Sequence, residues 1–156
     1  MTETAIQLGA ESGSREALQL ILALGLGAIV GLERRLRGHP AGIHTNALVS
    51  LGSAAFVIAG LSLGGDVSRV AAQVVTGSGF ICAGVILHQG TDIRGLNTAA
   101  TLWCTSAMGV LAAVNRPLLA CMVASATLLT NVALHYVEHV LVKMKVANAV
   151  ESKNLP

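Results

Sequence analysis

The chain has 156 residues and a formal net charge of +2; 53% of the residues are hydrophobic and only 12% are charged. Soluble domains carry about 25% charged residues, so this composition argues against a water-soluble helical bundle and favours a membrane protein. The net charge is too small to indicate a nucleic-acid partner. Three cysteines lie inside apolar stretches without paired spacing, which indicates neither a disulfide framework nor a zinc site.

Charged residues divide the chain into five apolar blocks, and each block is expected to be a transmembrane helix. A hydrocarbon core about 30 Å thick takes roughly 20 apolar residues. The predicted fold class is therefore an all-α membrane protein, a bundle of five transmembrane helices in one domain, residues 17–142. An N-terminal external segment, 1–16, precedes this domain and a short cytoplasmic tail, 143–156, follows it. The predicted helices are about 17–32, 45–65, 70–87, 95–115 and 117–137.

The first block is short for a membrane span. Its 16 uncharged residues would cover about 24 Å at 1.5 Å per residue. Glu33 and Arg34, at its end, are therefore expected to be partly immersed and to matter for function or architecture, although a simple topology anchor is the alternative. Gly27 and Gly31 are small residues four apart, a spacing typical of close helix packing in lipid.

The second and third blocks add polar and small candidates. Thr45 and Asn46 open the second block on the same predicted side as Glu33. The third block holds further small residues; together with the small residues four apart in the other blocks, they predict a compact bundle and, as an additional expectation, a homodimer face. These packing candidates are Gly79, Ala83 and Gly84.

The fourth block begins with a polar group that carries the strongest functional candidate. Asp92 and Arg94 precede it, and across the same surface Arg94 could pair with Glu33 or Asp92 with Arg34. Asn97 and Thr98 enter the helix itself. An Asn at this place is either an ordinary N-cap or a polar contact for a partner, and the sequence leaves both open.

The fifth block offers a weak metal signal and no sign of catalysis. His135 and His139 are four apart on one helix face, but no further ligand accompanies them. No P-loop, nucleophile motif or pair of catalytic carboxylates occurs in the chain. We therefore expect no enzyme activity, no metal site and no cofactor.

The positive charges predict the orientation of the bundle. With five spans, one side of the membrane receives three Lys and Arg residues and the other side seven, together the ten in the chain. Because basic residues favour the cytoplasmic side, the N-terminus is predicted to lie outside and the C-terminus in the cytoplasm.

Four ordered motifs run through the first four blocks and together resemble the MgtC/SapB family of bacterial inner-membrane proteins. The resemblance covers roughly Leu18 to Val114. The motifs are Gly31-Leu-Glu-Arg34, Ala41-Gly42 with Thr45-Asn46-Ala47-Leu48-Val49, Arg69-Val-Ala-Ala-Gln73, and Gly95-Leu-Asn-Thr-Ala-Ala-Thr-Leu-Trp103.

The resemblance implies a multi-pass protein of the bacterial inner membrane that supports survival inside macrophages and growth when magnesium is scarce. It further implies inhibition of the F-type ATP synthase, whose membrane subunits would be the partner. The functionally important Asn of the family falls on Asn97. Family members also carry a soluble C-terminal domain, so we expect this chain to be either a short homologue or a truncated one.

Two functions are therefore carried forward. One is a regulatory membrane protein that binds another membrane complex. The alternative is a transporter or channel for magnesium or another ion, indicated by Glu33, Asp92 and Asn97 on one predicted side. Magnesium prefers several hard oxygen ligands, and the carboxylates here lie at the edges of the blocks, which disfavours a dedicated magnesium pore.

Overall fold

The computed structural model describes residues 2–89 and 92–153, with side chains described for 12–86, 93–134 and 136. Five helices and one short hairpin follow one another along this part of the chain. They are α1 (Thr2–Leu36), α2 (Ile43–Ser62), α3 (Val67–Val85), β1 (Leu87–Gln89), β2 (Asp92–Arg94), α4 (Leu96–Ala113) and α5 (Pro117–Lys153).

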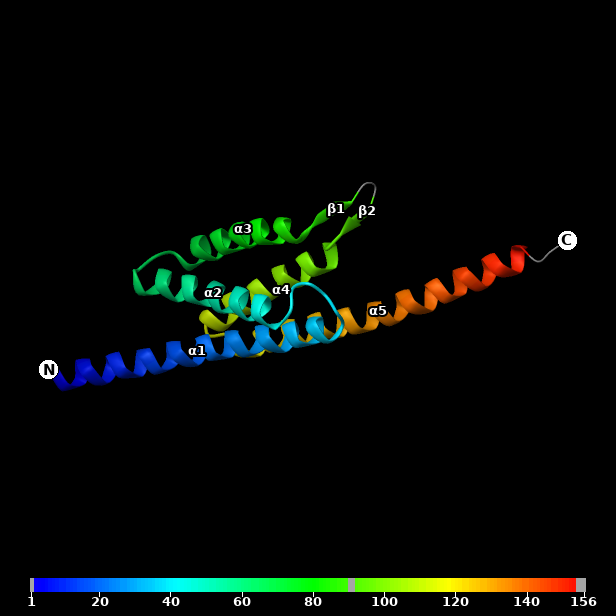
Figure 1. The fold of residues 1–156 in the computed structure, drawn as a ribbon. Helices are drawn as coiled ribbons and strands as arrows, with labels where there is room; N and C mark the ends of the chain where they lie inside the picture. The colour runs from blue at the N-terminus through cyan, green and yellow to red at the C-terminus, as the bar shows by residue number, and fades with distance from the viewer. Residues whose placement is uncertain (1, 90–91, 154–156) are drawn as a thin grey trace.

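Consecutive helices run in alternating directions, as the short connections between them require (Figure 1). The two long helices, α1 and α5, lie side by side over part of their length and project beyond the bundle at opposite ends (Figure 1). Helix α4 contacts all four other helices. It is therefore the central element of the bundle, while α3 lies at the edge.

The helices extend beyond the apolar blocks that predicted them. Helix α1 begins at Thr2 and continues to Leu36, and α5 continues to Lys153, through the segments expected as an external segment and a tail. Glu, Lys and Arg are good helix formers, so a charged residue marks the end of an apolar stretch without ending the helix.

The chain between α3 and α4 forms two short strands, so the prediction of a purely helical fold was incomplete. Residues on either side of 90–91 form a two-stranded antiparallel hairpin in which Leu87 pairs with Arg94 and His88 with Ile93. Gly95 then turns the chain into α4 with φ +92°, a left-handed conformation that favours glycine. The fold is helical, with this hairpin added.

Large apolar side chains face outward, while small and polar side chains fill the interior. Leu18, Phe56 and Phe80 are all more than 60% exposed, whereas the buried core is rich in alanine. Two interior clusters join α1 to the other helices, one around Ala54 and Val57 and one around Val30. An apolar outer surface over helices of this length fits a lipid environment.

Within the part of the chain that the structure describes, three helical segments are long and apolar enough to cross a membrane by length and composition. They are Ser12–Leu36, Ile43–Ser62 and Pro117–Leu134. The protein is accordingly a helical membrane protein, and the five crossings and the external N-terminus stay predictions.

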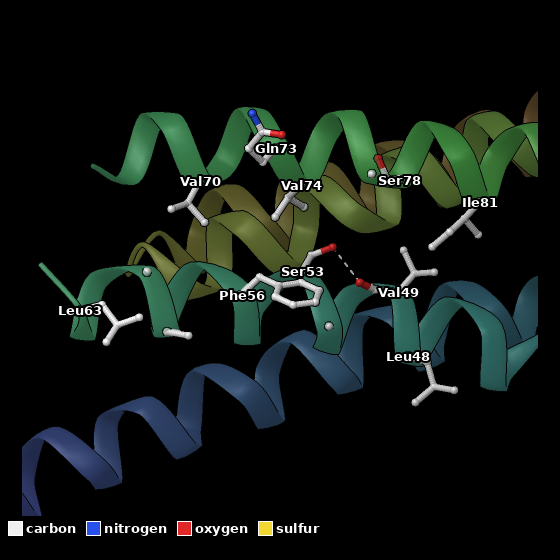
Figure 2. Close-up of a pocket in the computed structure, with 14 residues that line it drawn as sticks. Leu48, Val49, Ser53, Phe56, Leu63, Val70, Gln73, Val74, Ser78 and Ile81 are labelled. Atoms are coloured by element: carbon white, nitrogen blue, oxygen red, sulfur yellow. Dashed lines mark hydrogen bonds between the residues drawn. The ribbon is translucent and has the colours of Figure 1, made fainter. Parts of the chain in front are cut away.

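An apolar groove of about 710 Å³ separates parts of α2 and α3 (Figure 2). Leu48 and Phe56 line it from α2, and Ile81 lines it from α3. Its two serines, Ser53 and Ser78, donate their hydroxyl groups to carbonyl oxygens of their own helices, at 2.7 and 2.9 Å. With Gln73 as its other polar lining residue, the groove presents mainly hydrocarbon, and no lining residue is charged.

Candidate functional site

On α2, α4 and α5, polar residues recur at helical spacing, and the face of each helix that carries them lies toward the interior of the bundle. Every one of these side chains is buried. In lipid, such residues stabilise a bundle by hydrogen-bonding between helices. They are Asn46, Ser50 and Ser53 on α2, Thr98, Thr101 and Thr105 on α4, and Thr127 and Asn131 on α5.

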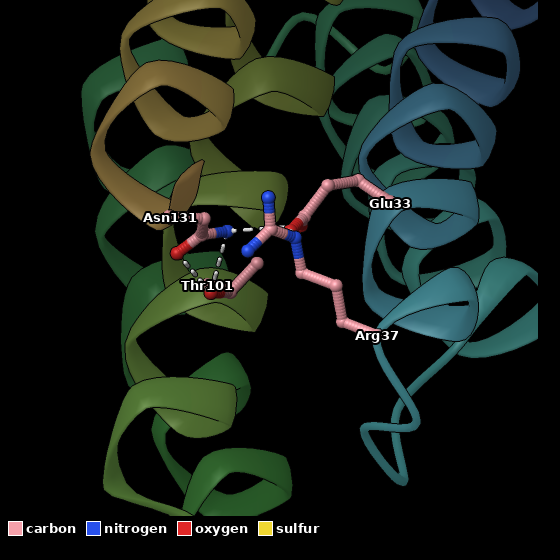
Figure 3. Close-up of polar contacts among 4 residues, drawn as sticks. All are labelled: Glu33, Arg37, Thr101 and Asn131. Atoms are coloured by element: carbon pink, nitrogen blue, oxygen red, sulfur yellow. Dashed lines mark hydrogen bonds and ion pairs between the residues drawn. The ribbon is translucent and has the colours of Figure 1, made fainter. Parts of the chain in front are cut away.

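The Glu33 cluster, formed by Glu33, Arg37, Thr101 and Asn131, joins α1 to α4 and α5 (Figure 3). Arg37 Nε lies 2.5 Å from Glu33 Oε1, one helical turn away. Asn131 Nδ2 donates to Glu33 Oε2 at 3.5 Å and lies 3.4 Å from Thr101 Oγ1. The carboxylate of Glu33 thus has a partner on each of its oxygens.

Asn46 holds the connection between α1 and α2 against α4. Its Nδ2 donates to the carbonyl oxygens of Ala41 and Gly42, both at 3.0 Å, and its Oδ1 accepts a bond from Thr105 Oγ1 at 2.9 Å. Gly27 makes this approach of helices possible, because an added Cβ there would lie 2.5 Å from the carbonyl oxygen of Asn46. Asn46 is therefore a structural tie within the bundle.

Arg34 is fully enclosed by the bundle, with only 1% of its surface exposed. Its neighbours in sequence differ from it: Arg35 is exposed and Arg37 is partly exposed. The expected pairing of Glu33 with Arg94 is not what the structure has, because Glu33 pairs with Arg37, which lies four residues on and directly after α1. Arg94 is exposed on β2, and the side chain of Asp92, the expected partner of Arg34, lies outside the described residues.

Asn97 lies at the start of α4 with its side chain exposed. The N-cap of α4 is Gly95, so Asn97 is inside the first turn and is not the ordinary cap that the sequence left open. Its carbonyl oxygen accepts a bond from Thr101 Oγ1 at 2.9 Å. Thr98, the next residue, is buried. The backbone of Asn97 is thus tied to the Glu33 cluster while its amide group points away from the core.

The remaining predicted residues are distributed over the same end of the bundle and over α3. Thr45 is partly buried beside Asn46. Gly31 lies against α2, where an added Cβ would be 2.6 Å from Ile43 Cα. On α3, by contrast, an added Cβ at Gly79 or Gly84 would meet no atom within 4 Å, and Ala83 is exposed. A homodimer stays a prediction.

No group of three histidine, cysteine or acidic side chains lies close enough to hold a metal ion within the part of the chain whose side chains are described. His135 and His139, the weak metal candidates, have side chains outside that part. The site is therefore described by hydrogen bonds, one ion pair and one enclosed guanidinium group.

Several interior residues were not singled out from the sequence, above all Arg37, Thr101, Thr105 and Asn131. A signal for three of them was present. Thr101 and Thr105 are four apart, and Asn131 follows Thr127 by four, so each pair lies on one helix face within an apolar block. Arg37 gave no comparable signal, because it follows two other arginines outside the apolar block.

Comparison with known proteins confirms the family resemblance. The model of the MgtC family matches residues 20–140. A relative named Protein MgtC from Salmonella typhimurium (strain 14028s) is 50% identical over 95 residues, which cover 60% of this chain and 41% of that protein. Protein MgtC from Brucella abortus (strain 2308) is 53% identical over 88 residues, covering 55% of this chain and 37% of that protein. The chain thus spans about two fifths of the length of these relatives, and no solved structure matches it.

Proposed function

Because this chain belongs to the MgtC family, we propose that it is a multi-pass regulatory protein of the bacterial inner membrane that acts by binding another membrane complex. The complex we propose is the F-type ATP synthase, through its membrane subunits, and the effect is inhibition. Such inhibition would support survival inside macrophages and growth in low magnesium. The protein has no enzymatic step in this proposal.

The observation that carries the proposal is the position of Asn97. An exposed amide group in a membrane protein offers two donors and one acceptor to a neighbour. Here the backbone beneath it is fixed by Thr101, which is itself held in the Glu33 cluster. An amide group whose backbone is already held in place is well suited to contact a partner helix, because little conformational freedom is lost on binding.

The interior of the bundle supports a binding role over a conducting one. Glu33 is the one acidic side chain of α1 to α5, among those described, that takes part in the interior network, and both of its oxygens are engaged. Several of the polar side chains around it bond to each other or to backbone, as Thr105 does to Asn46. These bonds between helices favour a fixed scaffold over an open path.

We test the proposal by ATP-driven acidification of inverted bacterial membrane vesicles with and without the protein. The expected result is slower acidification with the wild-type chain and a normal rate with Asn97→Ala at equal membrane content. Gln73→Ala, which removes an exposed amide from α3, is the matched control and should inhibit as the wild type does. An uncoupler control separates inhibition from proton leak.

Two results would count against this reading. Equal inhibition by the wild type and Asn97→Ala would remove Asn97 from the partner surface. Unchanged acidification with verified insertion, together with failure to recover ATP synthase after mild crosslinking, would remove the inhibitor proposal itself.

The second candidate function is ion transport, favoured by the charged side chains of Glu33, Arg34 and Arg37 among interior side chains that are apolar or polar but uncharged in the described part of the chain. Charged groups at membrane depth commonly mark ion pathways. Purified protein in liposomes should then carry magnesium or another cation down a gradient. Absence of flux in sealed liposomes that contain folded protein would exclude this candidate.

A further inference from the structure

Arg34 is a buried cation with unused hydrogen-bond donors. It is 1% exposed, and its Nε and Nη2 atoms are buried without an acceptor among the described residues. The N–H of Nε and one N–H of Nη2 point in the same direction. Together they form the edge with which arginine binds an oxyanion through two parallel bonds.

The neighbouring carboxylate does not neutralise this edge. Glu33 Oε1 pairs with Arg37 Nε at 2.5 Å, and Glu33 Oε2 accepts from Asn131 Nδ2. The end of α1 therefore places the positive charges of Arg34 and Arg37 around a single negative charge. An uncompensated charge in a protein interior is costly, so a bound anion would stabilise the fold.

The fold brings Arg34 close to the end of the bundle. The connection between α1 and α2 turns back onto it, since the N–H of His39 donates to the carbonyl oxygen of Arg34 at 3.0 Å. Asn46 holds the far end of the same connection through Ala41 and Gly42. Arg34 therefore lies next to this connection, and the nearby side chain of Arg37 is partly exposed.

We propose that the Nε and Nη2 edge of Arg34 binds a phosphate group, with two phosphate oxygens accepting the two donors. A phosphate has further oxygens beyond those two. Arg37 lies three residues on and therefore on the same side of α1, and its guanidinium carries donors besides the Nε that holds Glu33. A phosphate can bridge both arginines, whereas a carboxylate would spend both oxygens on one.

Two sources supply the same chemistry. One is inorganic phosphate or a small phosphate ester that reaches the site from the aqueous phase. The other is the phosphate of a lipid headgroup, because Arg34 and Arg35 lie in the last turn of a segment long and apolar enough to span a membrane, and Arg37 follows that segment directly. The inference does not depend on the proposed partner of Asn97.

The test uses the purified full chain in a detergent without phosphate, with thermal unfolding followed by the fluorescence of its single tryptophan. A ligand that binds the folded state raises the midpoint of unfolding in a saturable way. We expect this with inorganic phosphate and not with chloride at equal ionic strength. In parallel, native mass spectrometry reports any phospholipid that stays bound.

Matched variants assign the effect to the edge of Arg34. Arg34→Gln should weaken the apparent phosphate affinity at least tenfold, and Arg34→Lys, which keeps the charge without the paired donors, should weaken it to an intermediate degree. Arg35→Gln removes the exposed arginine next in sequence and should leave the affinity unchanged. If Arg34→Gln does not fold, the Arg34→Lys and wild-type titrations still decide.

The outcomes separate the two sources and can overturn the proposal. A saturable response to inorganic phosphate supports the soluble source. One retained phospholipid per chain, lost in the Arg34 variants, supports the lipid source. Absence of both in the wild type, or an effect of equal size in Arg34→Lys and the wild type, overturns the proposal.

Discussion

Helices α3 and α4 are neighbours in the chain and nearly equal in length, with 19 and 18 residues, but they pack in opposite ways. Helix α4 contacts every other helix and buries both small and polar side chains. Helix α3 buries Ser78 and exposes Phe80, Ile81 and the small residues near them.

This difference shows which properties bring a helix into the interior of a membrane protein. Apolar side chains gain little by moving from lipid to the interior, so helix association depends on close packing and hydrogen bonds. Helix α4 supplies both, through Gly109, Thr101 and Thr105. Most residues of α3 gain little free energy by moving from lipid to the interior, and α3 therefore lies at the edge of the bundle.

The largest expected effect comes from adding a side chain where α4 meets α2. An added Cβ at Gly109 would collide with the carbonyl oxygen of Ser50, which is backbone and cannot easily move. We expect Gly109→Ala to lower the free energy of unfolding by about 3 kcal/mol, as overpacking does. Unfolding in mixed detergent micelles measures this change.

Gly84→Ala on α3 is the matched control, because its added Cβ would meet nothing within 4 Å. It should leave stability unchanged or raise it by up to about 1 kcal/mol, since alanine is the better helix former. Equal effects of the two substitutions would show that α3 and α4 are packed alike.

A smaller effect is expected from removing a hydrogen bond between α4 and α2. Thr105→Val deletes the donor to Asn46 Oδ1 with little change in shape. Bonds between membrane helices contribute about 0.6 kcal/mol on average, and we expect a loss of that order. Thr76→Val on α3 removes only a bond to the carbonyl oxygen of Ala72 on the same helix and should cost less.

A double-mutant cycle of Thr105→Val with Asn46→Ala isolates the pairwise contribution. If the two losses simply add, the bond between these residues does not stabilise the bundle, and Asn46 acts through Ala41 and Gly42 alone.

The smallest effect concerns the start of α3. Asp66 is its N-cap: its carboxylate accepts hydrogen bonds from the hydroxyl and the N–H of Ser68, which hold its pKa below the ordinary value of 3.8. Since the pKa is lowered by folding, the stabilisation is fully present above pH 3.8 and is lost as the pH falls through the folded-state pKa.

Asp66→Ala should therefore lower the unfolding midpoint slightly at pH 7, and the difference from the wild type should shrink toward pH 2. Asp66→Asn keeps a capping side chain without the charge and serves as the control for charge. A difference that grows on acidification would contradict the assigned cause.

The apolar blocks predicted where the helices lie, because a run of about 20 apolar residues is typical of a transmembrane helix, but they predicted the helix ends poorly. Arg15 and Glu16 marked the start of the first block, although both are compatible with a helix and α1 runs through them. The hairpin at Leu87 and Arg94 was missed because three-residue strands leave no usable alternation.

The sequence predicted at which end of the bundle the candidate site lies, but not which of its side chains contact one another. Glu33, Arg34 and Asn46 were singled out because polar residues are rare near membrane depth. Which partner each one takes depends on how the helices are rotated, and the sequence alone does not record that rotation. For this reason Arg37, and not Arg94, is the partner of Glu33.

The bonds of Asn46 also bear on the order in which the bundle assembles. Its two bonds to Ala41 and Gly42 join residues four or five apart, so they can form as soon as α1 and α2 have entered the membrane. Its bond from Thr105 spans 59 positions and has to wait for α4. Until α4 packs against α2, the amide oxygen of Asn46 lacks its Thr105 donor, so the packing of α4 is the step that completes the bonds of Asn46.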